Sequence, residues 1–315
     1  MMIKPKFWDY KYLNLPALIL LPFTIVIRLS NFFFRFYPKI NNNKIISICV
    51  GNIYLGGTGK TPTTIKLFNI LKKIRKNVVT GKKINSSHID EILILKKKTS
   101  LLLAKSRNQI ITKAVKKKID IIVFDDGLQD KYIDYNIKFA CFDSVSGVGN
   151  ASLIPSGPLR ENLSSIKRFD GIFLKYINKK NQRLINLIKK QSPKINIFHT
   201  KYRIKNKKIF DLKKKYLVFS GIGNSIALQK FLMYENFKII KSLEYPDHHN
   251  YDLGDLKKIF KIAHEYRASI ITTEKDYIKI PKVYKKIISF IEIDLFIENE
   301  DKLIKFLKSK INEKH

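Results

Sequence analysis

Short β-branched runs alternate with amphipathic stretches from residue 44 onward. The β-branched runs predict strands at 45–50, 77–80, 120–124, 137–142 and 171–175. The amphipathic stretches predict helices at 61–73, 107–118 and 181–191. Strands that alternate with helices are typical of βαβ units, so the sequence predicts an α/β fold with a mostly parallel sheet.

A second, smaller α/β block follows a lysine-dense stretch at 192–210, where we expect a domain junction. Its predicted strands are 215–220, 237–243, 269–272 and 287–293. Helices are predicted between the first two strands, at 253–266 and at the C-terminus. We therefore expect two α/β domains, at 41–205 and 206–315, behind an N-terminal segment at 1–40.

Residues 13–27 of that N-terminal segment carry no charge. The run is short for a bilayer-spanning helix, which needs about 20 apolar residues, and Pro16 and Pro22 interrupt it. No small-residue cleavage site follows, so a signal peptide is not predicted. Aromatic residues beside lysine and arginine instead predict a membrane-interface anchor helix on an anionic lipid face. These aromatic residues are Trp8, Tyr10, Tyr12, Phe32, Phe33, Phe34 and Phe36. Two alternatives are a helix packed on the protein's own core and a single spanning helix.

Composition makes this chain of 315 residues strongly basic, with a formal net charge of +35. Lysine accompanies abundant isoleucine and asparagine, a bias that A/T-rich codons produce by themselves. No nucleic-acid-binding module is recognisable, so we expect no nucleic-acid partner but attraction to anionic lipid and phosphorylated substrates. Cys49 and Cys141 both lie in predicted strands, which excludes a disulfide framework and suits a reducing cytosol.

A glycine-rich segment directly follows the first predicted strand, and Pro62 suits the first turn of the helix behind it. Glycine N–H groups and a helix N-terminus bind phosphate oxygens, a lysine reaches the β- and γ-phosphates, and a threonine hydroxyl binds Mg²⁺. Tyr54 stands where the general phosphate-loop pattern has glycine. We predict binding of ATP with Mg²⁺; the alternative is a strand-to-helix turn without a ligand. The predicted phosphate-loop ligands are Gly56, Gly57, Thr58, Gly59, Lys60 and Thr61.

Paired carboxylates end the predicted strand at 120–124, where phosphate-loop proteins keep the acid that orients Mg²⁺. Asp125 and Asp126 are therefore predicted metal ligands. An ordinary Asp-Asp-Gly turn is the alternative interpretation.

Three further motifs follow, each with its own combination of charged residues and turn formers. They are Pro155-Ser-Gly-Pro-Leu-Arg-Glu161, Tyr245-Pro-Asp-His-His-Asn-Tyr251 and Thr272-Thr-Glu-Lys-Asp276. With the phosphate loop and Asp125-Asp-Gly-Leu-Gln129, they closely resemble the tetraacyldisaccharide 4'-kinase family of lipid A biosynthesis. The resemblance implies an enzyme at the cytoplasmic face of the bacterial inner membrane, monotopic or peripheral. It implies transfer of the γ-phosphoryl group of ATP to the 4'-hydroxyl of a tetraacyldisaccharide 1-phosphate, which yields lipid IVA.

The resemblance also assigns roles to individual residues. Lys60 and Thr61 would bind the triphosphate and Mg²⁺, and Asp125, Asp126 and Glu161 would lie near the metal. Arg160 would stabilise negative charge, with Gln129 close by. His248 would orient a catalytic carboxylate, which the Ile89-Asp90-Glu91 segment identifies as Asp90. Asp90 would accept the proton of the acceptor hydroxyl.

This chain departs from the family pattern after Thr80, where the usual Ser-Arg-Gly-Tyr-Gly stretch is absent. Lys82 or Lys83 would supply the lost charge. Asp130 also replaces the usual histidine. Without the family match, His248 would be interpreted as part of a surface turn. The segment Thr272–Asp276 is compatible with either a helix cap or a substrate contact.

Three other functions are compatible with parts of the sequence. One is a membrane-associated phosphate-loop NTPase, or a kinase for another acceptor. A second is a basic nucleotide-binding protein without catalysis, and a third is a degenerate family member that phosphorylates slowly. Oligomeric state and acyl-chain preference do not follow from the sequence.

Overall fold

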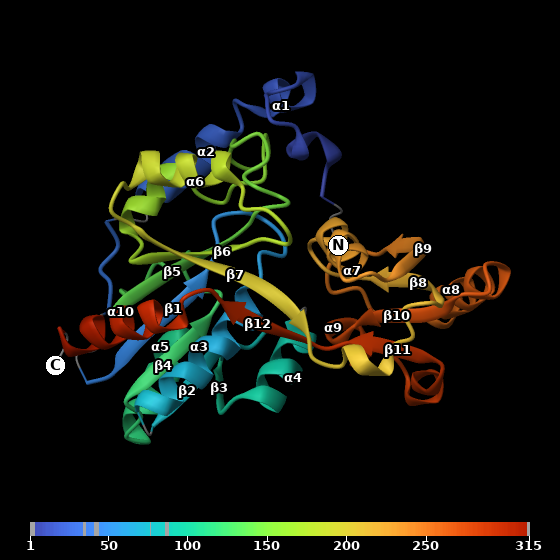
Figure 1. Cartoon of the computed structure of the whole chain (residues 1–315). Helices are drawn as coiled ribbons and strands as arrows, with labels where there is room; N and C mark the ends of the chain where they lie inside the picture. The colour runs from blue at the N-terminus through green and yellow to red at the C-terminus, as the bar shows by residue number, and fades with distance from the viewer. Residues whose placement is uncertain (1–3, 34–35, 41–43, 76, 86–87, 314–315) are drawn as a thin grey trace.

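The larger of two lobes is built on an eight-stranded sheet (Figure 1). The computed structural model describes residues 4–33, 36–40, 44–75, 77–85 and 88–313. The strand order is β12-β7-β6-β5-β1-β4-β2-β3, and only β12 runs antiparallel to its neighbour. The strands are β1 Ile46–Gly51, β2 Val78–Lys83, β3 Leu101–Ala104, β4 Ile121–Asp125, β5 Ile137–Asp143, β6 Gly171–Lys175, β7 Asn196–Ile204 and β12 Ile293–Ile297.

Helices cover both faces of the large sheet, which buries every residue of β1. One face packs against α3 (Lys60–Ile74) and α10 (Glu300–Asn312). The other packs against α5 (Arg107–Lys116), α6 (Gln182–Gln191) and the short η3 (Leu163–Arg168). This doubly wound arrangement leaves the carboxyl ends of the parallel strands uncovered, where α/β proteins bind ligands.

The smaller lobe has a four-stranded parallel sheet in the order β11-β10-β8-β9. Its cores lie on opposite faces, one under α7 (Ser225–Tyr234) and one under α8 (Leu253–Glu265). The short helix α9 (Glu274–Tyr277) directly follows β10. The remaining elements are β8 Lys215–Ser220, β9 Lys238–Glu244, β10 Ser269–Thr273, β11 Ile288–Ile291, η4 Lys207–Ile209 and η5 Lys282–Lys286. The predicted α/β fold with mostly parallel sheets is confirmed.

The C-terminal residues do not follow the predicted division of the chain. They were predicted to complete the smaller domain, but β12 pairs with β7 at the edge of the large sheet. Leu303, Leu307 and Ile311 of α10 are buried in the same core as β1. The chain therefore returns to the large lobe, and Figure 1 shows β12 beside β7 on the side of the large sheet that faces the small lobe. The stretch predicted as a junction, 192–210, contains β7 itself.

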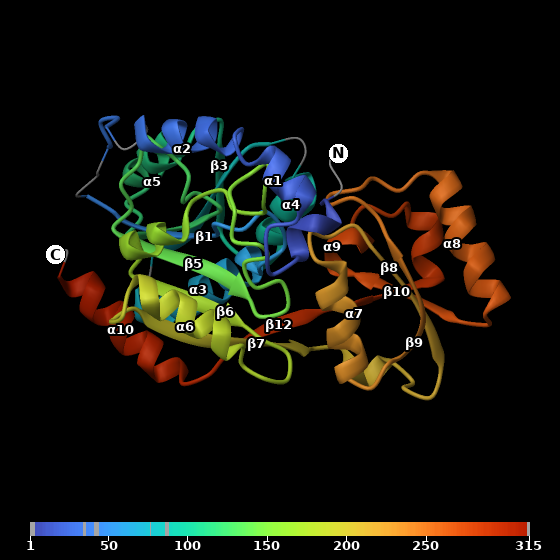
Figure 2. The same ribbon diagram turned by 90° about the horizontal axis from the view of Figure 1, so that it is seen from above.

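The N-terminal segment forms short helices along the large lobe, which Figure 2 shows from above. They are η1 (Lys6–Asp9), α1 (Leu15–Leu20) and α2 (Thr24–Phe33). Among the described residues, no helix is long and apolar enough to cross a membrane. The prediction that Trp8 belongs to the membrane anchor is wrong, because the residue is 1% exposed and its Nε1–H donates to the Pro155 carbonyl. Phe34 lies outside the described residues.

Besides β7, β12 and the short η3, two consecutive elements of the large lobe were missed from the sequence. They are α4 (Ile89–Lys98) and β3 (Leu101–Ala104). Three consecutive lysines and a threonine, Lys96–Lys98 and Thr99, end the apolar pattern of this stretch early. The omission matters because α4 carries Asp90 and Glu91 in its first turn.

The packing of α10 predicts the effect of truncating Leu307, which is fully buried. Leu307→Ala is expected to lower the free energy of unfolding by about 2–5 kcal/mol, because it leaves a cavity between α10 and the sheet. Denaturant unfolding measures this loss, with the neighbouring exposed Lys308→Ala as the control. A loss below about 1 kcal/mol would show that α10 does not pack as described.

Candidate active site

The phosphate loop leaves β1 and enters α3 through two glycines with positive φ. Gly56 has φ +140° and Gly59, the residue before α3, has φ +88°. A Cβ at Gly59 would also lie 2.8 Å from the Tyr202 hydroxyl, so only glycine fits there. Asn52 Nδ2 donates to the Gly56 carbonyl and to the Thr58 hydroxyl, which holds the loop in shape. The loop thereby presents backbone N–H groups at a helix N-terminus.

Tyr54, which replaces the usual first glycine, points away from the phosphate loop's ligand side into the core. Its side chain is 2% exposed and packs in the cluster beneath η3. Lys4 Nζ lies 2.9 Å from its hydroxyl. The substitution therefore attaches the N-terminal segment to the loop and leaves the glycines near α3 in place.

Asp125, the last residue of β4, lies next to the start of α3. The Thr61 and Thr64 hydroxyls donate to its two carboxylate oxygens, at 3.1 and 3.2 Å. Lys82 Nζ lies 2.6 Å from Asp125 Oδ2 and 2.6 Å from Glu91 Oε2. Burial lowers the pKa of Lys82, but the two carboxylates raise it by more. The net shift of the pKa is upward, so the ammonium stays charged. Of the two lysines proposed to replace the missing arginine, Lys82 is the one inside the site, and Lys83 is exposed.

Asp126 adopts the left-handed conformation, φ +58°, and its carboxylate is directed at two cations. Lys60 Nζ lies 3.7 Å from Oδ2, and Arg160 Nη1 lies 3.5 Å from Oδ1. Burial raises the pKa of Asp126, but Lys60, Arg160 and Lys82 lower it more, so the net shift is downward. Its buried Oδ1 accepts no hydrogen bond within the described residues.

Gln129 connects Arg160 to Glu161. Its Nε2 donates to Glu161 Oε1 at 2.9 Å, and its Oε1 lies 3.3 Å from Arg160 Nη1. The other Glu161 oxygen pairs with Arg168. Both Glu161 oxygens thus have protein partners, as both Asp125 oxygens also do. Glu161 stays a predicted metal ligand.

Asp90 and His248 meet across the two lobes. Asp90 lies in the first turn of α4 and is 2% exposed, and His248 lies in the loop after β9. His248 Nδ1 lies 2.8 and 3.0 Å from the two Asp90 oxygens. Burial raises the pKa of Asp90, but the His248 hydrogen bond and the charges of Lys275 and Lys279 bring it below its ordinary value. Asp90 is therefore a carboxylate at neutral pH.

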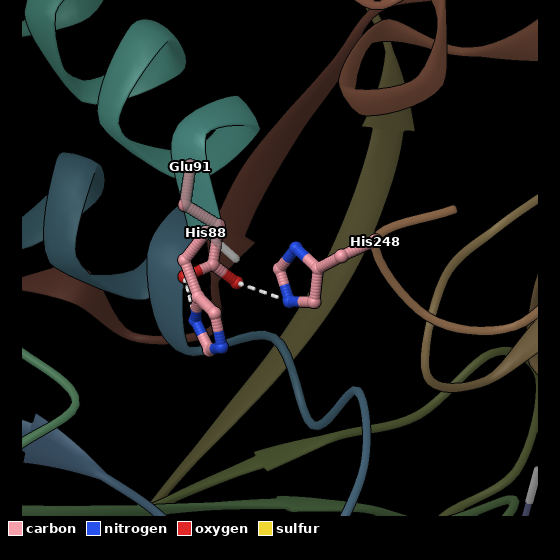
Figure 3. Close-up of side chains that lie close together, drawn as sticks. All are labelled: His88, Glu91 and His248. Carbon is pink, nitrogen blue, oxygen red and sulfur yellow. Dashed lines mark ion pairs between the residues drawn. The ribbon is translucent and has the colours of Figure 1, made fainter. Parts of the chain in front are cut away.

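Glu91, beside Asp90, points between two histidines (Figure 3). His88 Nδ1 lies 3.5 Å from Glu91 Oε2, and the rings of His88 and His248 stack with centroids 4.2 Å apart. Burial raises the pKa of Glu91, but His88, Lys82 and Lys275 hold it well below its ordinary value. Sequence reasoning named Glu91 only as a neighbour of Asp90, and it missed His88 and Lys275.

The small lobe closes over the phosphate loop. A Cβ at Gly223 would lie 2.4 Å from the Gly57 nitrogen, so the loop after β8 touches the phosphate loop directly. Asn224 Nδ2 donates to the Ser146 hydroxyl of the large lobe at 2.6 Å. A cavity of about 990 Å³ lies between the lobes, lined by the phosphate loop, Asp126, Arg160 and the loop that carries His248. The cavity is large enough for a nucleotide and part of a second substrate.

The site thus combines a triphosphate-binding loop with a buried carboxylate held by histidine. Comparison with known proteins agrees with this chemistry. The model of the Tetraacyldisaccharide-1-P 4'-kinase family matches residues 14–312. The chain belongs to this family.

Relatives of this kinase match over nearly its whole length. A tetraacyldisaccharide 4'-kinase from Pelagibacter ubique is 40% identical over 315 residues, covering 99% of both chains. One from Rickettsia typhi is 33% identical, covering 96% of this chain and 97% of its own. The crystal structure of LpxK from Aquifex aeolicus in complex with ATP has the same fold, with a TM-score of 0.65 at 20% identity. The structural match covers 94% of this chain and 100% of the Aquifex aeolicus chain. The resemblance and the kinase class are confirmed.

The buried contacts of Lys82 predict a stability effect in this kinase. Lys82→Met would leave Asp125 and Glu91 without their shared cation, so we expect the free energy of unfolding to fall by about 3–5 kcal/mol. Denaturant unfolding of the purified protein measures the change. The matched control is Lys83→Met, one residue further along and exposed. Equal stabilities of the two variants would contradict the described burial of Lys82.

Proposed function

We propose that this kinase transfers the γ-phosphoryl group of ATP to the 4'-hydroxyl of the lipid A precursor tetraacyldisaccharide 1-phosphate, forming lipid IVA. The observation that carries the proposal is that His248, hydrogen-bonded to the buried Asp90, lines the same cavity as the phosphate loop. A hydroxyl acceptor needs a base, and ATP needs a phosphate cradle, and both are present at one cavity. The activity of the family, and the ATP complex of the Aquifex aeolicus relative, support the same assignment.

The phosphate loop and two cations would bind and orient the triphosphate. Backbone N–H groups from Gly57 to Lys60 precede or open α3, whose N-terminus attracts anions. Lys60 and Arg160 already converge on Asp126, so their charges meet where a γ-phosphate would be transferred. Phosphoryl transfer has a loose transition state, and catalysis rests mainly on positioning and on stabilisation of negative charge.

The donor set beside the phosphate loop fits Mg²⁺. Thr61, Asp125 and Asp126 offer a hydroxyl and carboxylate oxygens, the hard ligands that Mg²⁺ prefers. The buried Asp126 Oδ1, which accepts no hydrogen bond within the described residues, is an available donor. Bound Mg²⁺ would neutralise phosphate charge during transfer. Glu161 is the further predicted ligand, and one of its oxygens accepts a hydrogen bond from Gln129 Nε2.

Asp90 is the proposed base for the acceptor hydroxyl. Its low pKa keeps it ionised at neutral pH, and a weak base suffices because the transition state is loose. His248 holds the carboxylate by hydrogen bonds to both oxygens, which restricts its rotation. The proton of the acceptor hydroxyl passes to Asp90 as the acceptor oxygen bonds to the γ-phosphorus and ADP leaves.

The N-terminal helices would dock the enzyme on the anionic cytoplasmic surface of the bacterial inner membrane, as a monotopic or peripheral protein. Large apolar side chains on α1 and α2 are exposed, a pattern that favours an apolar environment. Asn31 of α2 donates to the Arg160 carbonyl, so this surface is attached next to the cavity. The N-terminal apolar surface comprises Leu15, Leu18, Ile19, Phe23, Ile25, Val26, Leu29, Phe32 and Phe33.

A transfer assay tests the proposed reaction. Wild type should move radiolabelled γ-phosphate from ATP to tetraacyldisaccharide 1-phosphate in detergent micelles. Asp90→Asn should lower kcat by about 10²–10⁴-fold while ATP still binds, because only the base is lost. Lys60→Ala should lower transfer and weaken ATP binding together. Lys73→Ala, at an exposed position of the same helix, is the control.

Two outcomes of this assay would contradict the proposal. If wild type binds ATP but transfers no phosphate, the acceptor is different or the protein is a non-catalytic member. If Asp90→Asn keeps kcat within about tenfold of wild type, the base assignment is wrong.

Vesicle co-sedimentation tests the proposed membrane docking. The double change Val26→Glu and Leu29→Glu should weaken binding to phosphatidylglycerol-containing vesicles by at least about tenfold, since each buried apolar side chain contributes about 1.5–3 kcal/mol. The control is Val283→Glu, at an exposed apolar position on the small lobe. Equal loss in the control, or no loss in the double variant, would place the membrane contact elsewhere.

A further inference from the structure

In the Thr272–Asp276 motif, Thr273 and Asp276 bond within the small lobe, whereas Glu274 and Lys275 contact α4 of the large lobe. The Thr273 hydroxyl accepts from the Asp276 backbone N–H and so caps α9. The fully buried Asp276 accepts from the Gly221 backbone N–H at 3.1 Å and from the Tyr251 hydroxyl at 3.0 Å. These contacts support the helix-cap interpretation for Thr273 and Asp276. They leave Lys275, which lies between them, unexplained.

Lys275 reaches the pair of residues that performs the proposed chemistry. Its Nζ lies 3.3 Å from His248 Nε2, on the side of the ring opposite Asp90. It lies 3.0 Å from Asp247 Oδ1 and 3.6 Å from Glu91 Oε1. The Asp90 Oδ2 atom is 3.9 Å away. Lys275 thus holds a single ammonium among three carboxylates and one imidazole nitrogen.

The protonation of this ammonium follows from its neighbours. Burial lowers the pKa of Lys275, but Asp247, Glu91 and Asp90 raise it more, so the net shift is upward. A lysine ammonium has three donors and no acceptor. Its contact with His248 Nε2 is therefore a hydrogen bond only when Nε2 carries a lone pair, which places the ring proton on Nδ1, facing Asp90. Asp247 Oδ1 and Glu91 Oε1 also face Nε2, at the longer distances of 3.7 and 3.8 Å.

We propose that Lys275 is a positioning residue that fixes the tautomer of His248, so that Nδ1–H donates to Asp90 and keeps it an ionised, oriented base. This inference rests on the proposed function only for its catalytic consequence. Without the lysine, Nε2 is free to take the proton. Nδ1 would then either become an acceptor facing a carboxylate, which separates the two groups, or belong to an imidazolium.

The same geometry explains a cluster that resembles a metal site. One ligand atom from each of His88, Glu91 and His248 lies within 4.8 Å of the others. Lys275 Nζ approaches two of these atoms, and Lys82 Nζ approaches Glu91 from the other oxygen. Two ammonium groups thus supply the positive charge that a metal would bring. The cluster is better described as the charged surroundings of the Asp90–His248 pair.

Nitrogen NMR tests the tautomer without any phosphoryl transfer. In protein labelled with ¹⁵N-histidine, long-range ¹H–¹⁵N spectra distinguish a protonated from an unprotonated ring nitrogen, and His248→Gln identifies the His248 signals. Wild type should show an unprotonated Nε2 and a protonated Nδ1. Lys275→Met should show a protonated Nε2. The matched control Lys282→Met, an exposed lysine nearby, should give the wild-type pattern.

Kinetics tests the consequence for catalysis. Lys275→Met should lower kcat by about 10- to 100-fold, a part of what a general base contributes, with the KM for ATP within about threefold of wild type. Lys275→Ala should regain activity with added ethylammonium, a recovery that a misfolded protein would not show.

Three results would overturn the inference. One is a wild-type His248 with its proton on Nε2, and another is an unchanged His248 spectrum in Lys275→Met. The third is a Lys275→Met variant whose defect is confined to the KM for the lipid acceptor, which would make Lys275 a substrate contact. Failure of wild type to phosphorylate the lipid would refute the proposed function and leave the NMR result on the tautomer standing.

Discussion

Four carboxylates lie together at the carboxyl edge of the large sheet, two of them buried and two partly buried, and such charge persists only where cations or hydrogen-bond donors replace the lost water. The large lobe supplies Lys60 and Lys82, and the small lobe supplies Lys275 and His248. Each carboxylate has at least one of these partners, so the charge balance of the site requires both lobes. The four carboxylates are those of Asp90, Glu91, Asp125 and Asp126.

This requirement links the position of α4 to the small lobe. Beyond the Asp90–His248 contact, Lys98 of α4 pairs with Glu274 of α9 and lies 3.3 Å from Glu292, before β12. The chain also passes between the lobes twice: β7 leads from the large sheet towards the small lobe, and β12 returns antiparallel beside it. These covalent connections and the ion pairs of Lys98 both join the two lobes. Asp90, the phosphate loop and the cavity are therefore held in one arrangement by contacts that cross the lobes.

The N-terminal segment adds a second connection, between the site and the outer surface. Trp8 donates to the Pro155 carbonyl, Lys4 reaches the Tyr54 hydroxyl, and Asn31 donates to the Arg160 carbonyl. These bonds attach the N-terminal apolar surface to the loop that carries Arg160. A lipid-bound acceptor presented at that surface would thus meet the cavity in a defined orientation. Trp8, which was predicted to face lipid, is instead buried and helps to fix the N-terminal segment to the large lobe.

The sequence by itself determined the phosphate loop, because a strand, its glycines and the following helix are contiguous and each follows local rules. It also indicated Asp90 and His248, but only through the resemblance of separate motifs. Only the tertiary structure decided that β12 returns to the large sheet, since a five-residue apolar strand carries no mark of its partner. The same holds for Lys82 and Lys275, which are two lysines in a chain where lysine and arginine total 61. Their roles depend on which carboxylates the fold places beside them, and that follows from long-range packing and the need to neutralise buried charge.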